Sequence, residues 1–186
     1  MILKLVLAVS LLALASPAPT QAQTPSQSQT TVEKRSPHGK LIKSIVYINR
    51  DYGFRFHLPT SWKGFSVLVE PQSGELWVKG QEEPKPEYYK MIVIQDPRST
   101  EAEPRQDIPI MVFTHKQWKL VEEGTLVVSA APIGPGELGR NREYVFALPP
   151  RYNYAFPEGY EEVEKIISRG SLKPFDVDSS GKNTKR

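Results

Sequence analysis

The stretch NRDYGFRFHLPTSW, residues 49–62, decides the fold at the start of the domain. Apolar and polar side chains alternate in FRFHL, residues 54–58, with the period of two that a strand with one apolar face requires. Gly53 precedes this run, and glycine tolerates the positive φ of a tight turn. Pro59 lacks an amide hydrogen and should end the strand. The stretch therefore predicts a hairpin with the apolar run before it, and Trp62 should fold back over the core.

Six short runs rich in β-branched and aromatic residues predict the other strands. Two of them, MIVI and YVFAL, are apolar on both faces, as strands are when both sides of a sheet are covered. The runs are residues 45–48, 65–69, 91–95, 110–113, 125–129 and 144–148.

Two helices are predicted from their end signals. Thr114 and Gln117 have the spacing of a capping box, and Gly124 marks the end of that helix. The second helix should open at Pro157 and end at Gly170, with glutamates in its first turn, as the helix dipole favours. Short strands and two helices around a two-sided sheet predict an α+β fold, namely an α/β/α sandwich with a mostly antiparallel central sheet.

The N-terminus has the layout of a secretory signal peptide. An early lysine precedes an apolar run and small residues that offer cleavage after Ala15 or after Ala22. We expect residues 1–22 to be this signal, residues 23–40 a disordered linker, residues 41–175 a single sandwich domain, and residues 176–186 a disordered tail. The apolar run is shorter than the roughly 20 residues that span a bilayer, so no stable membrane insertion is expected after cleavage.

The composition excludes several classes of function. The chain has no cysteine, so it has no disulfide, thiolate metal site or cysteine nucleophile. A cysteine-free exported domain points to a bacterial periplasm or exterior. The net charge of +3 is too small for a nucleic-acid-binding composition. We therefore expect a secreted or periplasmic protein with no nucleic-acid partner.

The pattern N-x-x-Y-G-F-x-F-x-L-P-x-S-W at residues 49–62 resembles the opening hairpin of the PsbP-like proteins. An amphipathic helix followed by SLKPF, residues 171–175, is similar to the C-terminal end of the same superfamily. The resemblance covers the two ends of the domain. It implies the α/β/α sandwich that PsbP-like proteins share with the Ran-release-factor family. It also implies a non-catalytic accessory or binding role, although no motif carries over a particular partner.

No catalytic, cofactor or metal site is predicted. The segment IGPGELG, residues 133–139, contains a G-x-G-x-x-G spacing, but a strand rather than a helix should follow it, so we interpret it as a glycine-proline turn. The histidines, His38, His57 and His115, have no metal-ligand spacing, and no G-x-S-x-G motif is present. A catalytic site assembled by folding stays open as an alternative.

Two loops carry the candidate binding residues. Tyrosine and arginine dominate binding hot spots, and tyrosines also stack on sugars. The candidates are Arg98 and Arg105 in loop 96–107, and Arg151, Tyr152, Tyr154 and Phe156 in loop 149–156. The leading hypothesis is an exported, non-catalytic binding or accessory protein of the cell envelope with a protein partner. A carbohydrate- or peptidoglycan-binding module is the alternative, and a secreted hydrolase is less favoured.

Overall fold

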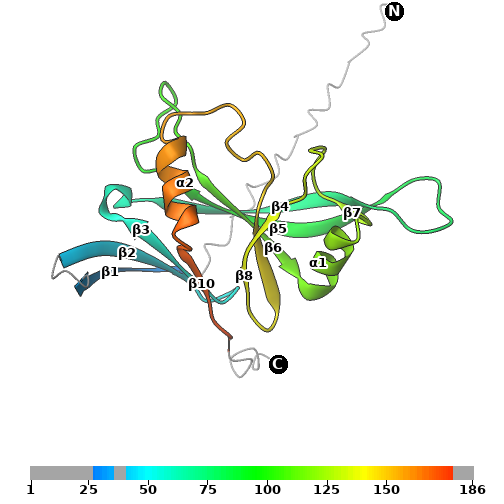
Figure 1. Ribbon diagram of the computed structural model, residues 1–186, viewed down its shortest axis with the longest axis horizontal. Helices are drawn as coiled ribbons and strands as arrows, with labels where there is room; N and C mark the ends of the chain where they lie inside the picture. Colours follow the sequence, from blue (N-terminus) through cyan, green and yellow to red (C-terminus); the bar gives the residue numbers. More distant parts are fainter. Residues whose placement is uncertain (1–26, 36–40, 178–186) are drawn as a thin grey trace, which may run out of the picture.

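The computed structural model describes residues 27–35 and 41–177. It is mostly antiparallel sheet, with 45% of residues in strands and two α-helices. The strands form a four-stranded and a six-stranded sheet, in which neighbouring strands run antiparallel. The chain is therefore α+β, and the two helices lie in different parts of the molecule (Figure 1).

The four-stranded sheet contains the predicted hairpin, which is confirmed. Asn49 pairs with Phe54, and Gly53 turns the chain with φ 75°. A Cβ on Gly53 would collide with the backbone oxygen of Phe175, so the position requires glycine for space as well as for φ. In sheet order the strands are β1 (Gln27–Arg35), β2 (Leu41–Asn49), β3 (Phe54–Pro59) and β10 (Leu172–Pro174).

The prediction of a disordered linker over residues 23–40 is wrong for residues 27–35. These residues form β1, which pairs with β2 from Gln27 opposite Asn49 to Arg35 opposite Leu41. Backbone pairing at a sheet edge forms this strand, and its residues Thr30–Val32 are exposed, so a polar composition did not reveal it.

The two ends of the chain extend beyond the part that the structure describes. The predicted signal peptide, residues 1–22, lies outside the described residues. The predicted tail, residues 176–186, is described only to Val177, and there the Asp176 carboxylate accepts a hydrogen bond of 2.9 Å from the backbone amide of Arg142.

The six-stranded sheet contains the other predicted strands, most of them longer than expected. Except for Phe65, which precedes its strand, the runs 65–69 and 91–95 lie in two eleven-residue strands that form a long hairpin, which projects at one end of the molecule (Figure 1). Backbone pairing continues into polar residues once the register is set by the apolar part. In sheet order the strands are β7 (Leu126–Val127), β4 (Ser66–Leu76), β5 (Lys85–Gln95), β6 (Ile108–Thr114), β9 (Tyr144–Leu148) and β8 (Gly136–Arg140).

The glycine-rich segment is not a simple turn. Its second half is β8, which pairs with β9 and has a register shift between Glu137 and Gly139. A Cβ on Gly139 would lie 2.9 Å from Cγ of Pro174, so close packing explains this glycine. The segment leads into β9 and lacks the strand–helix junction that a dinucleotide site needs.

The first helix, α1 (His115–Glu122), begins as predicted. The Thr114 hydroxyl accepts a hydrogen bond from the Gln117 amide, and the Gln117 side chain accepts one from the Thr114 amide. The second helix, α2 (Tyr160–Ser168), starts three residues later than predicted because Gly159 serves as its N-cap with φ 84°.

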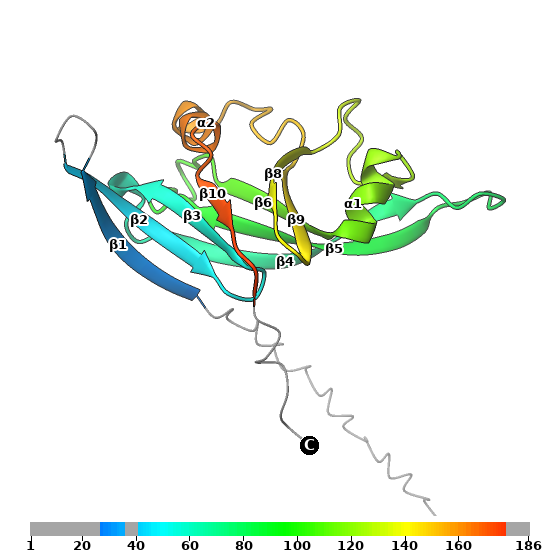
Figure 2. The same cartoon turned by 60° about the horizontal axis from the view of Figure 1, so that its bottom comes forward.

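The core forms two clusters, one on each face of the six-stranded sheet. The larger cluster joins both sheets and α2, and the smaller one packs Trp118 of α1 against Met111, Phe113 and Val145. In Figure 2, α2 lies toward the β1–β3 end of the molecule and α1 toward the β4–β5 hairpin. The larger cluster includes Tyr47, Phe54, Phe56, Leu58, Trp62, Ile92, Ile110, Phe146, Val163 and Ile166.

Candidate functional site

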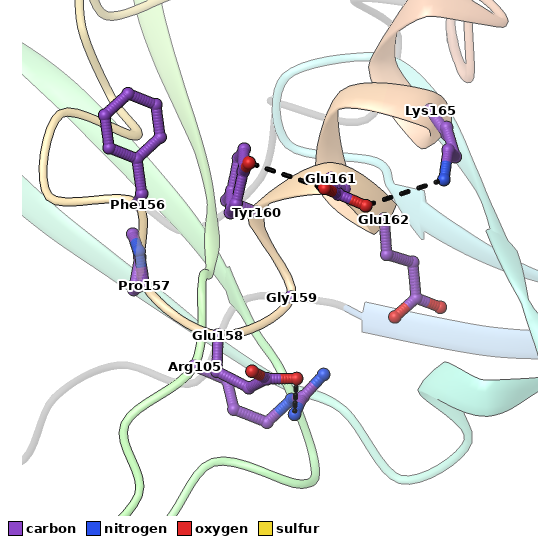
Figure 3. Close-up of a pocket in the computed structure, with 9 residues that line it drawn as sticks. All are labelled: Arg105, Phe156, Pro157, Glu158, Gly159, Tyr160, Glu161, Glu162 and Lys165. Carbon is purple, nitrogen blue, oxygen red and sulfur yellow. Dashed lines mark hydrogen bonds and ion pairs between the residues drawn. The ribbon is translucent and has the colours of Figure 1, made fainter.

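The candidate site is a cavity of about 560 Å³ at the N-terminal end of α2 (Figure 3). Its walls come from loop 96–107, from the segment between β9 and α2, and from the first two turns of α2. It brings together two of the predicted binding residues, Arg105 and Phe156. The lining residues are Arg105, Phe156, Pro157, Glu158, Gly159, Tyr160, Glu161, Glu162 and Lys165.

An ion-pair network centred on Asp96 holds these segments together. The Asp96 side chain is 1% exposed and accepts hydrogen bonds from Nε and Nη2 of Arg98, at 2.8 and 2.6 Å, and from Nε of Arg105, at 3.0 Å. Arg98 also binds Glu162 of α2 at 2.6 Å. Arg105 reaches Glu158 at 3.2 Å. The network thus fixes loop 96–107 against the start of α2.

The charges of the network support one another. Burial alone raises the pKa of Asp96, but the hydrogen bonds from Arg98 and Arg105 outweigh it, so this pKa lies below its ordinary value. Burial likewise raises the pKa of Glu162, and hydrogen bonds from Arg98 and Ser61 bring it below the usual range. The hydrogen bond to Asp96 raises the pKa of Arg98. All three groups are therefore charged at neutral pH. Arg98 and Arg105 bind carboxylates of their own chain.

Two exposed aromatic rings lie in the segment between β9 and α2, and one of them, Phe156, lines the cavity. Phe156 is 67% exposed and Tyr154 is 74% exposed. The ring of Phe156 packs edge-on against Tyr160, with 5.2 Å between the ring centroids (Figure 3). The backbone that presents them is unusual, because Arg151 and Phe156 adopt positive φ values of 53° and 47°.

Tyr152 lies on the other side of this segment. It is half-buried and packs against the main core, and burial raises the pKa of its hydroxyl. Its carbonyl oxygen also accepts a hydrogen bond of 3.4 Å from Nε2 of Gln106. Of the aromatic residues predicted in this loop, Tyr152 therefore maintains the fold, and Tyr154 and Phe156 face solvent. Arg151 is exposed but does not line the cavity.

Sequence reasoning did not assign binding roles to the acidic residues of the cavity. The side chains of Glu158 and Glu161 are 73% and 67% exposed. Glu158 forms the ion pair with Arg105, and Glu161 accepts a hydrogen bond of 3.4 Å from the Tyr160 hydroxyl and forms a 4.0 Å ion pair with Lys165 (Figure 3). We interpreted these glutamates as surface charges that favour the helix N-terminus. The signal for a surface that is both acidic and aromatic was the segment FPEGYEE, residues 156–162, in which Phe156 and Tyr160 alternate with glutamates.

A second cavity, of about 340 Å³, lies where the β2–β3 turn meets the six-stranded sheet. We call it the tyrosine groove. Tyr52 and Tyr144 pack edge-on with 5.3 Å between the ring centroids, and Tyr88 is 67% exposed. None of their three hydroxyl groups bonds to another described residue. The groove is lined by Tyr52, Pro71, Tyr88, Tyr89, Lys90, Val112, Thr114, Gln117 and Tyr144.

Three further observations bear on the chemistry of the chain. Among the residues that the structure describes, no group of three or more metal-ligating side chains is placed to hold a metal ion. No helix in the same residues has the length and apolar character needed to cross a membrane. The chain matches no protein-family model, and no curated protein and no solved structure matches it.

Proposed function

We propose that this protein is an exported, non-catalytic binding or accessory protein of the cell envelope that engages a protein partner through Tyr154, Phe156 and Tyr160. We call these three residues the aromatic surface. The observation that carries the proposal is the exposure of Tyr154 and Phe156 on a backbone held at positive φ. Exposing a large aromatic ring to water is unfavourable in free energy, and a partner that covers the ring relieves this cost.

The surroundings of the aromatic surface favour binding. Turn hydrogen bonds from the Tyr154 amide to the Arg151 carbonyl and from the Phe156 amide to the Asn153 carbonyl hold the loop, at 3.0 and 2.9 Å. The Asp96 network holds the neighbouring loop. A partner would therefore meet a largely preformed surface, which reduces the entropy cost of binding. The exposed carboxylates of Glu158 and Glu161 suit a partner that is basic at the rim of its interface.

Replacing the two exposed rings should abolish capture of the partner without unfolding the protein. The variant is Tyr154→Ala/Phe156→Asn, in which asparagine tolerates the positive φ at position 156. Immobilised wild type and variant are compared for the proteins that they retain from native envelope extract, identified by mass spectrometry. We expect the melting temperature to stay within roughly 3 °C, because surface substitutions usually change stability by less than about 0.5 kcal/mol.

The matched control is Trp77→Ala/Val78→Ala, which removes two hydrophobic side chains that are 46% and 40% exposed at the tip of the β4–β5 hairpin. This control should retain the partner. If the two variants retained the partner protein equally well, the aromatic surface would not be its binding site.

Export and the finer fold class belong to the same proposal. The arguments for export are the signal-peptide layout of residues 1–22 and the lack of cysteine. Helix α1 covers one face of the six-stranded sheet, and α2 covers the other face together with the four-stranded sheet. The second sheet in that layer means that the α/β/α arrangement is supported only in part. The PsbP-like resemblance at residues 49–62 and 171–175 favours an accessory role.

N-terminal sequencing of extracytoplasmic protein should give Gln23 or Ser16 as the first residue.

The second candidate function is binding of a carbohydrate or peptidoglycan, and the tyrosine groove is the observation that favours it. Tyrosine rings stack on sugar faces, and their unbonded hydroxyl groups can bond to sugar hydroxyls. Tyr88→Ala should reduce sedimentation with insoluble cell wall by roughly tenfold if the ring contributes about 1.4 kcal/mol to binding. Tyr154→Ala removes an equally exposed tyrosine elsewhere and should sediment like wild type. Identical sedimentation of all three proteins would exclude the groove as a glycan site.

A further inference from the structure

A third cavity, of about 410 Å³, lies at the opposite end of α2 from the candidate site. It is formed where β2, β3 and β10 meet the C-terminal end of the helix. Leu58, Pro59 and Ile166 supply apolar walls. Four basic side chains line it as well, namely Lys43, His57, Arg169 and Lys173, and no acidic residue is among its described lining residues. We call it the basic pocket.

Two of the four basic side chains have no acidic partner among the described residues. Within residues 27–35 and 41–177, neither Arg169 nor Lys173 takes part in an ion pair. Nζ of Lys173 lies 3.6 Å from the place that a Cβ would occupy on Gly170, which is itself a lining residue. The ammonium group is therefore turned toward the pocket. Like charges gathered in one concave site repel each other, and an anion between them relieves this repulsion.

Capping of α2 does not account for these cations. Cations often lie at the C-terminal end of a helix to satisfy its last carbonyl groups. Here the Ile166 carbonyl already accepts the Ser171 hydroxyl at 2.6 Å, and the Ile167 carbonyl accepts the Gly170 amide at 2.9 Å. The Arg169 and Lys173 side chains thus remain available to a ligand.

We propose that the basic pocket binds a phosphate-bearing ligand. Arg169 and Lys173 supply the charge-assisted hydrogen bonds that a phosphate prefers, and Lys43 and His57 line the same pocket. The cavity is larger than one phosphate group, and its apolar walls suit the organic part of a phosphate ester. Two sources share this chemistry, a soluble phosphate compound and the headgroup of an anionic phospholipid.

The test compares the full chain with Arg169→Gln/Lys173→Gln and with the control Lys79→Gln/Lys116→Gln. Both exposed control lysines lie outside the basic pocket and form no ion pair with a described residue, so both variants lose two positive charges. Each protein is titrated with inorganic phosphate by calorimetry. Each is also sedimented with phosphatidylcholine vesicles that contain or lack phosphatidylglycerol. Circular dichroism in the buffer used for the titrations confirms that all three proteins are folded.

We expect the pocket variant to bind phosphate roughly tenfold more weakly or worse, because two charge-assisted hydrogen bonds are lost, while the control binds like wild type. A matching loss of phosphatidylglycerol binding in the pocket variant alone identifies the source as a lipid headgroup. A loss for inorganic phosphate alone identifies a soluble ligand. Equal binding by the pocket variant and the control in both assays would overturn the proposal, since net charge rather than the pocket would then explain any binding.

Discussion

Trp62→Ala is expected to lower the free energy of unfolding by about 3–5 kcal/mol, the range for removing a large buried aromatic side chain. Trp62 is 0% exposed and belongs to the main core cluster. It sits in a short 3-10 turn, Thr60–Trp62, directly after β3, so its ring closes the core at the point where Pro59 ends the strand. Alanine would leave a cavity that the surrounding sheets cannot close without moving.

The matched control is Trp77→Ala, which truncates a tryptophan that is 46% exposed. It should cost less than about 1 kcal/mol, because little packing is lost. Urea denaturation followed by far-UV circular dichroism measures both changes. Comparable losses at positions 62 and 77 would contradict the assignment of Trp62 to the core.

Trp62→Phe separates packing from hydrogen bonding. Nε1 of Trp62 is buried and has no hydrogen-bond partner among the described residues. A buried donor without a partner costs about 1–3 kcal/mol, so replacing the indole by an apolar ring removes this cost while it keeps part of the packing. We therefore expect Trp62→Phe to retain most of the stability that Trp62→Ala loses.

Asp96→Ala is expected to have the second large effect, about 3–5 kcal/mol, because it removes the shared partner of two arginines. The carboxylate is almost completely buried and is bonded to both Arg98 and Arg105. Without it the two guanidinium groups repel each other, and the ion pairs of Arg98 with Glu162 and of Arg105 with Glu158 lose the buried carboxylate that orients them. Urea denaturation of wild type and variant at pH 7 measures the loss.

Glu161→Ala is the control for this change, because Glu161 is an exposed acidic residue of the same region whose interactions, a 4.0 Å ion pair with Lys165 and a 3.4 Å hydrogen bond from Tyr160, lie at the surface. Such a surface pair contributes about 0.5 kcal/mol or less. If Asp96→Ala were as mild as Glu161→Ala, the network would not be a stabilising element of the fold.

The Asp96 network also predicts a pH dependence. The pKa values of Asp96 and Glu162 are lower in the folded protein than their ordinary values. Their contribution to stability is therefore fully present above the unfolded-state pKa of about 4 and is lost as the pH falls through the folded-state values. Burial acts in the opposite direction on Asp107, whose pKa is raised.

The difference in stability between wild type and Asp96→Ala reports the contribution of the Asp96 carboxylate, including its effect on Asp107, whose pKa the Asp96 charge raises. Urea denaturation from pH 7 downward should show this difference shrinking below about pH 4. A constant difference down to pH 2 would contradict the role of the Asp96 charge.

Features set by neighbouring residues could be predicted from the sequence. The hairpin around Gly53 follows from alternation over residues 54–58 and from the conformational freedom of glycine. The capping box at Thr114 and Gln117 needs only a three-residue spacing, and the structure forms it. These signals depend on local backbone geometry, so they required no knowledge of the rest of the chain.

The strand over residues 27–35 and the roles within the binding loops were decided only by tertiary structure. Residues 27–35 pair because the edge of β2 offers backbone partners, which composition does not report. Arg98 and Glu162 are 64 positions apart, and only folding brings them within 2.6 Å. Tyr152 and Tyr154 looked equivalent in the sequence, but the structure buries part of one and exposes the other. The physical reason is that burial and ion pairing depend on distant segments, whereas turns and caps depend on neighbours in the chain.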